Sequence, residues 1–260
     1  MAYAHRLQGS RYEFKYIVPE AMVRPLRDFA RSYLVPDEHA DPANNWEYEV
    51  HSLYLDSPAL SLCQATMRGH KNRFKLRIRF YDDDPAGPVF FEIKRRESDV
   101  ILKQRAKVRR TAVRDLLAGH WPERSYLANG GNEANDYGAL QQFCFLRDHI
   151  NAQGQAFVSY TREAYVTAND NSVRMTFDRQ INGRRFAGAF GLTDGTAPVY
   201  PKVDGTVLEL KFTNRFPNWM REMCRVFDLE RTSMAKYVSC ITRLAARSPE
   251  AAGRALEFRP

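Results

Sequence analysis

Apolar and charged residues alternate along much of this chain. The stretch 75–81 reads KLRIRFY, so that Leu, Ile and Phe alternate with Lys, two Arg and Tyr. A period of two residues is typical of a β-strand, whose side chains point alternately to the two faces of a sheet. The pattern therefore predicts a strand with one apolar face and one cationic face.

The same alternation recurs in seven further segments. These predicted strands are residues 11–17, 48–56, 89–95, 101–109, 157–165, 172–178 and 206–212. Helical patterns are found at residues 19–34, 57–68, 111–118, 135–152, 215–228 and 235–247. We find no internal repeat and no domain boundary. The chain is therefore expected to form one α+β domain over residues 1–260, with a core of about 11–247 and antiparallel strands.

The basic residues are concentrated on the strand faces. These faces carry eleven cations and four anions, a balance of +7, whereas the formal charge of the whole chain is +8. The cations are Lys15, Lys75, Arg77, Arg79, Lys94, Lys103, Arg105, Lys107, Arg162, Arg174 and Lys211. The anions are Glu13, Glu92, Asp178 and Glu209.

Two arrangements could accommodate so many cations on neighbouring strands. One is an antiparallel sheet with a solvated outer face. The other is a closed antiparallel barrel of about eight strands, with apolar side chains outward under the helices and charged side chains inward around a basic tunnel. Like charges on adjacent strands repel each other, and a bound polyanion would offset this repulsion. Because the pattern repeats on so many strands, we expect the barrel.

The composition excludes several classes of protein. No segment approaches the ~20 apolar residues of a membrane span, and the N-terminus lacks the apolar core of a signal peptide. We therefore expect a cytoplasmic protein, while a membrane-bound partner and the oligomeric state are left open. The four cysteines and six histidines show no metal-ligand spacing, which favours free thiols.

The pI of about 9.4 predicts an anionic partner. A P-loop nucleotide site is excluded because the sequence contains no GxxxxGK[ST] motif. Nucleic acid is disfavoured because most of the aromatic residues on the strands lie on the face opposite the cations, where they cannot stack on bases. Carboxylates among the cations favour a phosphate chain that is bound together with a divalent cation.

An ordered set of motifs resembles the VTC domain, the polyphosphate polymerase module of the vacuolar transporter chaperone complex. That domain belongs to the triphosphate tunnel metalloenzymes, alongside the CYTH-type triphosphatases. The motifs are 11-RYEFKY-16, 54-YLDSPAL-60, 75-KLRIRFY-81, 91-FEIKRR-96, 160-YTREAY-165, 174-RMTFD-178, 208-LELKF-212 and 233-SMAKY-237. The best-known members carry an additional regulatory domain and membrane helices, whereas this chain resembles the free-standing bacterial type.

The resemblance implies an enzyme that binds the triphosphate of ATP with Mn²⁺ or Mg²⁺ and transfers the γ-phosphate to a polyphosphate chain. The implied catalytic residues are Lys15, Arg77, Arg79, Lys94, Arg162, Arg174 and Lys211. The implied phosphate-binding residues are Lys75, Lys103, Lys107, Ser233 and Lys236. Glu209 is the implied metal ligand, and Glu13 and Glu92 are further candidates.

Some roles have alternatives. Glu13 and Glu92 could instead form salt bridges with neighbouring cations, and Ser233 could be a simple helix N-cap. A triphosphatase of the same fold, or a protein that binds polyphosphate without catalysis, are the alternative functions.

Overall fold

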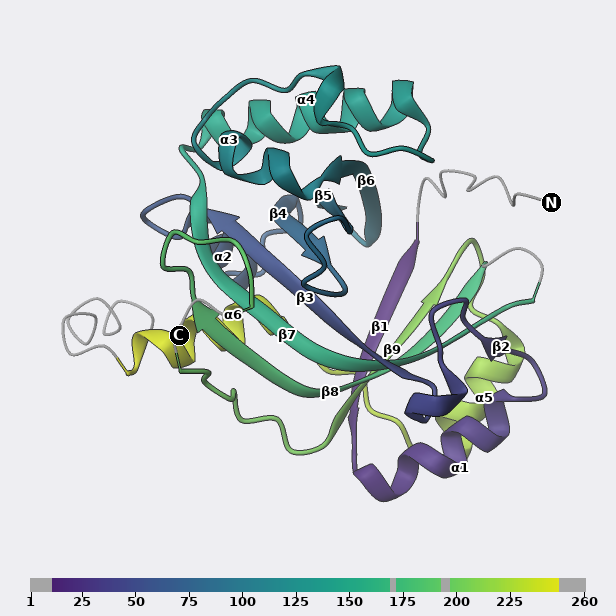
Figure 1. Cartoon of the computed structure of the whole chain (residues 1–260). Coiled ribbons are helices and arrows are strands. Elements are labelled where there is room, and N and C mark those ends of the chain that lie inside the picture. Colours follow the sequence, from purple (N-terminus) through teal and green to yellow (C-terminus); the bar gives the residue numbers. More distant parts are fainter. Residues whose placement is uncertain (1–10, 169–171, 193–196, 248–260) are drawn as a thin grey trace.

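A strongly curved antiparallel sheet is the main feature of the computed structural model, which describes residues 11–168, 172–192 and 197–247 (Figure 1). In these residues, eight strands follow one path in the order β1-β9-β8-β7-β3-β4-β5-β6, and the short β2 pairs with β7. The strands are β1 (Tyr12–Val18), β2 (Val35–Pro36), β3 (Glu47–Asp56), β4 (Arg73–Phe80), β5 (Pro88–Glu97), β6 (Val100–Arg109), β7 (Gln153–Val166), β8 (Val173–Arg185) and β9 (Thr206–Phe212). All of the pairings are antiparallel.

The described residues also form six α-helices and three single-turn 3₁₀ helices. The α-helices are α1 (Glu20–Ala30), α2 (Ser61–Met67), α3 (Val113–Leu117), α4 (Glu133–His149), α5 (Asn218–Val226) and α6 (Lys236–Ala245). The 3₁₀ helices are Pro42–Asn44, Arg110–Ala112 and Arg124–Tyr126. The predicted α+β class with antiparallel strands is therefore confirmed.

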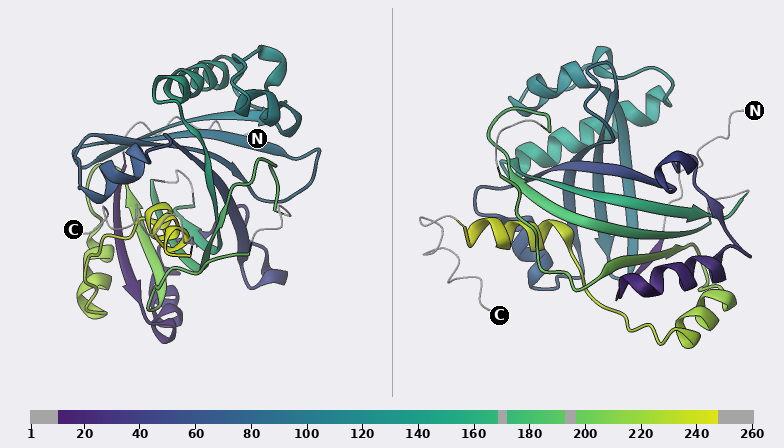
Figure 2. Two further views of the ribbon diagram at one scale, coloured as in Figure 1. Left: turned by 90° about the vertical axis from the view of Figure 1, so that its left-hand side faces the viewer. Right: turned by 60° about the horizontal axis from the view of Figure 1, so that its bottom comes forward.

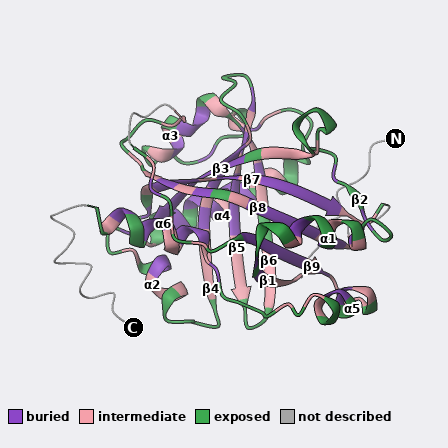
Figure 3. Ribbon diagram, turned by 90° about the horizontal axis from the view of Figure 1, so that it is seen from below, coloured by how far each residue is buried: buried purple, intermediate pink, exposed green. Residues whose placement is uncertain are grey.

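The apolar strand faces point outward and are covered by helices. Ile78 and Phe91 belong to a core cluster that includes Phe143 of α4, and α3 lies over the same side of the sheet. A second cluster packs α1 and α5 on β8, β9 and β1, with Leu26 and Met220 fully buried. Figure 3 shows the strands mostly buried or half-buried, whereas the helices are exposed on their outer sides. Burying a large apolar side chain contributes about 1.5–3 kcal/mol, so these faces hold the helices on the outside.

Helix α6 differs from the others because it lies inside the curve of the sheet (Figure 2, left). The Tyr237 ring of α6 stacks on Tyr54 of β3, with 4.7 Å between the ring centroids. Gly183 of β8 permits the close approach, since a Cβ atom there would lie 2.6 Å from the Cβ of Cys240. We call the sheet face that carries Tyr54 and contacts α6 the inner face.

The prediction of a closed barrel is not confirmed. β1 and β6 are the first and last strands of the path along the sheet. In the described residues they meet at one isolated bridge, where the Arg11 and Ile101 backbones exchange hydrogen bonds of 3.2 and 3.0 Å. β1 begins at Tyr12, directly after this bridge, and pairs with β9 along its length. The sheet is therefore strongly curved but is not closed by a continuous hydrogen-bond ladder.

A buried carboxylate connects two of the helices. Asp56 accepts hydrogen bonds from the backbone N–H groups of Ser57, Leu62 and Cys63 at 2.8 to 2.9 Å and from the Tyr237 hydroxyl at 3.0 Å. Helix α2 has no side-chain cap at its N-cap residue. Asp56 therefore satisfies the free N–H groups of the first turn of α2 and also ties α2 to α6.

We predict that Asp56→Ala lowers the free energy of unfolding by about 3 kcal/mol, because buried donors lose their acceptor. Chemical denaturation would measure this loss. Asp56→Asn keeps one acceptor oxygen and should lose less. A change below about 0.5 kcal/mol in Asp56→Ala, the range of ordinary surface substitutions, would contradict the prediction.

Candidate functional site

The register of the sheet places opposite charges beside each other on the inner face. Lys15 of β1 lies opposite Glu209 of β9, and Glu13 lies opposite Lys211. On β7 and β8, Arg162 lies opposite Asp178. Opposite charges at directly paired positions stabilise a sheet, whereas like charges destabilise it. The cationic face is therefore built around carboxylates rather than exposed as a uniform positive surface.

The larger group of charges surrounds Glu209. This Glu209 cluster consists of Glu13, Lys15, Lys94, Arg162, Asp178, Glu209, Lys211 and Lys236. Glu209 Oε1 lies 2.7 Å from Lys236 Nζ, and its Oε2 lies 2.8 Å from Lys211 Nζ. The carboxylate also lies 3.5 Å from Lys15 Nζ and 3.8 Å from an Arg162 amino group. One buried carboxylate thus has four cationic neighbours.

The other carboxylates complete the Glu209 cluster. Glu13 bonds Lys94 at 2.8 Å and lies 3.3 Å from Lys15. Asp178 accepts two hydrogen bonds from the Arg162 guanidinium, at 2.7 and 2.8 Å, and lies 2.6 Å from Lys236 Nζ. Lys236 is the first residue of α6, so the helix inside the curve supplies a cation to carboxylates of two strands.

The charges strongly perturb the ionisation of Glu209. Burial alone would raise the pKa of this carboxyl, but the charges of Lys211, Lys236 and Lys15 outweigh burial and hold the pKa well below its usual range. Lys236 contacts two carboxylates, those of Asp178 and Glu209. Burial alone would lower the pKa of Lys236, but the charges of these two carboxylates raise it. Glu209 and Lys236 are therefore both charged at neutral pH.

A second group of charges surrounds Glu92 of β5. This Glu92 cluster consists of Arg77, Arg79, Glu92, Lys103 and Arg105. Glu92 is fully buried and contacts Lys103 at 2.6 Å, Arg77 at 2.7 Å and Arg105 at 2.8 Å. The adjacent tyrosines orient two of the arginines, because Arg77 donates to the Tyr54 hydroxyl at 3.3 Å and Arg79 donates to the Tyr160 hydroxyl at 3.1 Å.

The remaining predicted residues have other surroundings. Arg174 donates to Asp37 and to the Tyr48 hydroxyl. Lys107 donates to the Asn129 carbonyl at 2.7 Å and is not in either cluster. Ser233 is exposed and precedes Ala235, the N-cap of α6, so the alternative of an N-cap serine is wrong.

Lys75 is the exception among the inner-face cations. It lies opposite Lys94, which in turn lies opposite Lys103, so three lysines form a row across β4, β5 and β6. In the part of the chain that the structure describes, no ion pair or hydrogen bond is formed by its side chain. Burial, followed by the charges of Lys15 and Lys94, lowers the pKa of Lys75 to about 7.

The sequence analysis did not identify Thr176, whose side chain lies on the inner face opposite Glu209. Its hydroxyl is buried and has no hydrogen-bond partner among the described residues. Such a group is rare in a folded protein and indicates a place where a ligand or bound water would make the missing bond. The sequence does contain a signal for Thr176. It lies two residues from both Arg174 and Asp178, and this spacing places all three side chains on the same strand face.

The carboxylates of the Glu209 cluster could hold a divalent cation only if a bound phosphate ligand supplied further oxygen atoms. The described residues contain no group of three His, Cys, Asp or Glu side chains that could hold a metal ion by itself. Glu209 and Glu13 both contact Lys15, and the unpaired Thr176 hydroxyl is nearby. Mg²⁺ is usually bound by one or two carboxylates, water and substrate phosphates, and this donor set matches the protein part of such a site. Glu92 belongs to the other cluster and forms salt bridges with Arg77, Lys103 and Arg105, which was the alternative to its metal-binding role.

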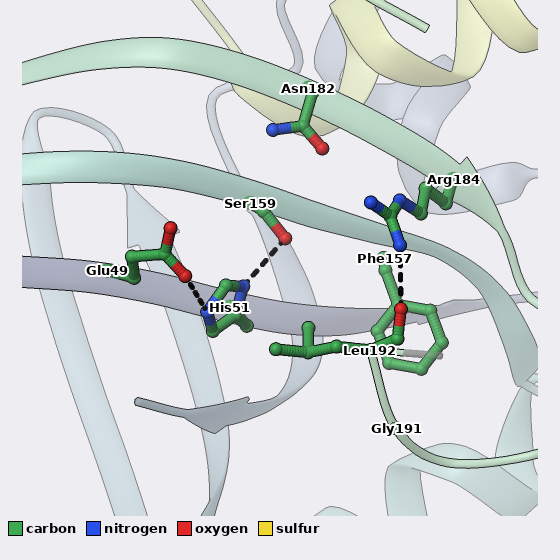
Figure 4. Close-up of a pocket in the computed structure, with 8 residues that line it drawn as sticks. All are labelled: Glu49, His51, Phe157, Ser159, Asn182, Arg184, Gly191 and Leu192. Carbon is green, nitrogen blue, oxygen red and sulfur yellow. Dashed lines mark hydrogen bonds and ion pairs between the residues drawn. The ribbon is translucent and has the colours of Figure 1, made fainter. Parts of the chain in front are cut away.

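The opposite sheet face contains a separate small cavity of about 150 Å³ (Figure 4). His51 lies 2.8 Å from the Ser159 hydroxyl and 3.0 Å from Glu49, and Arg184 donates to the Leu192 carbonyl. A wider hollow of about 440 Å³ lies beside the start of β3 and is lined in part by Glu47. Neither is lined by a member of the two charged clusters.

Comparison with known proteins identifies a family. The sequence matches the profile of the VTC domain over residues 10–245. No match was found among curated proteins.

Several solved structures resemble the chain at low sequence identity. A candidate adenylate cyclase from Bacillus halodurans is 10% identical, with a TM-score of 0.46 over 88% of this chain and 96% of that chain. One from Vibrio parahaemolyticus is 11% identical, with a TM-score of 0.45 over 88% and 97%. A chain of the Mediator head module from Schizosaccharomyces pombe is 6% identical, with a TM-score of 0.39 over 84% and 91%.

The unpaired Lys75 predicts a pH dependence of anion binding. Below pH 7 the free side chain is charged, and above pH 7 it is mostly neutral. A bound phosphate favours the charged form and raises the pKa, so binding above pH 7 takes up a proton. The affinity for inorganic triphosphate should therefore fall as the pH rises from 7 to 9, by up to about tenfold per pH unit.

Titration calorimetry of the wild type and Lys75→Met at several pH values would measure this effect. Protonation of the ligand is common to both proteins and cancels in the comparison. The variant should bind more weakly at pH 6.5 and should lack this part of the pH dependence. Parallel pH profiles for the two proteins would show that Lys75 does not contact the anion.

Proposed function

Because the chain belongs to the VTC domain family, we propose that it is a metal-dependent polyphosphate polymerase that uses ATP. The observation that carries this proposal is the convergence of cations from the strands and from α6 around buried carboxylates on the inner face. The Glu209 cluster has two more cations than anions, and the Glu92 cluster has three more. This excess of positive charge suits the several negative charges of a triphosphate.

The charged clusters would act by positioning the phosphate chain and neutralising its charge. Phosphoryl transfer proceeds through a transition state whose charge is spread over phosphate oxygens, so fixed cations stabilise it without a covalent enzyme intermediate. Arg77 and Arg162 are held by carboxylates and are thereby oriented before a ligand binds. The guanidinium groups can bind phosphate oxygens in a bidentate manner, whereas the lysines act as point charges.

The reaction needs no nucleophile from the protein. A terminal oxygen of the polyphosphate acceptor attacks the γ-phosphorus of ATP, the bond from that phosphorus to the β-phosphate oxygen breaks, and ADP leaves. Glu209, Glu13 and the Thr176 hydroxyl would hold Mn²⁺ or Mg²⁺ beside the phosphate oxygens. When bound, the metal ion would add charge neutralisation at those oxygens.

We predict that the protein incubated with radiolabelled ATP and Mn²⁺ produces labelled polymer that is longer than the substrate on a gel. Glu209→Gln keeps the size of the side chain but removes its charge, and it should reduce polymer formation by about 100-fold. Glu222→Gln is a matched control, because Glu222 pairs with Arg225 on the exposed side of α5 and should have little effect.

Other outcomes separate the alternatives. Release of free phosphate without polymer would contradict the polymerase and favour a triphosphatase. Binding without turnover with either metal would favour a non-catalytic polyphosphate-binding protein. Full activity of Glu209→Gln would remove the metal-binding role of Glu209.

A further inference from the structure

Four aromatic rings form a group at one end of the inner face. We call this group the aromatic rim: His39, Tyr48, Tyr81 and Phe90. The His39 ring stacks on Tyr81 with 5.5 Å between centroids, and it lies 5.8 Å from Tyr48. Tyr81 lies 6.3 Å from Tyr48 and 6.0 Å from Phe90. The rings come from the loop after β2, from β3, from the residue that follows β4 and from β5.

The aromatic rim is directly connected to the cations. Arg105 of the Glu92 cluster donates to the Tyr81 hydroxyl at 3.1 Å, and its guanidinium lies over the Phe90 ring at 3.8 Å. On the other side, Arg174 donates to the Tyr48 hydroxyl at 3.0 Å. An anion bound by Arg105 would therefore lie close to the rings.

The rings remain accessible. The His39 side chain is 53% exposed, and Tyr48, Tyr81 and Phe90 are half-buried. By contrast, Phe80 and Phe91, which point to the outer face from neighbouring positions, are almost completely buried. Packing in the outer core therefore does not explain why these residues are aromatic. Stacking on a flat ligand would use the exposed faces of the rings.

The order of residues along β4 fits a nucleotide. Arg77, Arg79 and Tyr81 occupy successive positions on the inner face, and each step along a strand face is about 7 Å. Arg77 and Arg79 belong to the Glu92 cluster, and Tyr81 follows immediately after the strand. A ligand lying along β4 would place its phosphates on the arginines and its organic part on the ring.

We propose that the aromatic rim is the site for the nucleobase of a nucleoside triphosphate. The base stacks on Tyr81, beside the His39 ring, while its phosphates lie among the cations of the Glu92 cluster. Every base has a π-face, so stacking of this kind tolerates different bases. This proposal rests on the proposed function, because it takes the phosphate chain to bind on the inner face.

Two ligands separate the contribution of the base from that of the phosphates. Titration calorimetry with Mg²⁺ would compare the β,γ-imido analogue of ATP, which is not hydrolysed at that bond, with inorganic triphosphate. Tyr81→Leu should weaken binding of the nucleotide by about tenfold and binding of triphosphate by less than about twofold. Tyr81→Phe keeps the ring and loses only the hydroxyl, so it should retain the preference of the wild type for the nucleotide.

A distant aromatic residue provides the control. Tyr33 is 48% exposed and stacks on Trp219 of α5 at 4.7 Å, away from the charged clusters, so Tyr33→Leu should change neither affinity. A nucleotide carrying 2-aminopurine adds a spectroscopic readout, because its fluorescence falls when the base stacks. This quenching should occur with wild type and Tyr81→Phe, and it should be lost with Tyr81→Leu.

Equal losses for both ligands in Tyr81→Leu would show that Tyr81 acts only through Arg105, and would overturn the nucleobase site. Unchanged binding of both ligands would overturn it as well. Failure of the wild type to bind either ligand would instead overturn the proposed function, and the nucleobase site with it.

Discussion

The pairing of buried carboxylates with cations on the inner face is the interaction on which the rest of the structure depends. A charge buried without a partner costs several kcal/mol, and removing one member of a buried pair costs about 3–5 kcal/mol. Glu92 is fully buried with three cations around it, and Glu209 has four cationic neighbours. Without these two carboxylates, the lysines and arginines could not be held on one curved face. The carboxylates therefore maintain a polycationic surface in the absence of a ligand.

The same arrangement has a consequence for ligand binding. A phosphate chain must compete with carboxylates that already occupy the cations, and only a ligand with several charges can engage many of them together. A singly charged anion would replace one contact at the cost of another. Lys75 differs because its side chain forms no ion pair in the described residues, and because burial and the charges of Lys15 and Lys94 outweigh the opposing effect of Glu13 and lower its pKa. The first contact of an incoming anion with Lys75 would therefore relieve repulsion without breaking an ion pair.

Much of this architecture could be predicted from local patterns, because the period of two residues determines which side chains share a strand face. Strand β1 and the strands from β3 to β9 follow from it, as do the cationic faces of all of these except β3 and the outward direction of residues such as Ile78 and Phe91. The partners of each charge could not be predicted, since they depend on register and on contacts distant in the sequence. Lys236 meets Glu209 across 27 residues, and Arg174 meets Asp37 across 137. Closure of the sheet also depends on such distant pairing, and among the described residues it is limited to the bridge between Arg11 and Ile101.

Helix α6 joins the charged clusters to the packing of the fold. Its first two residues, Lys236 and Tyr237, point to different partners: the lysine contacts Glu209 and Asp178, and the tyrosine donates to Asp56 and stacks on Tyr54. The position of the helix is thus determined by apolar packing and a buried hydrogen bond as well as by charge. A ligand that draws Lys236 away from the carboxylates would meet a helix that Tyr237 still holds in place. The adjustment would then be confined to a lysine side chain, which keeps the site ordered while its ion pairs are exchanged for phosphate contacts.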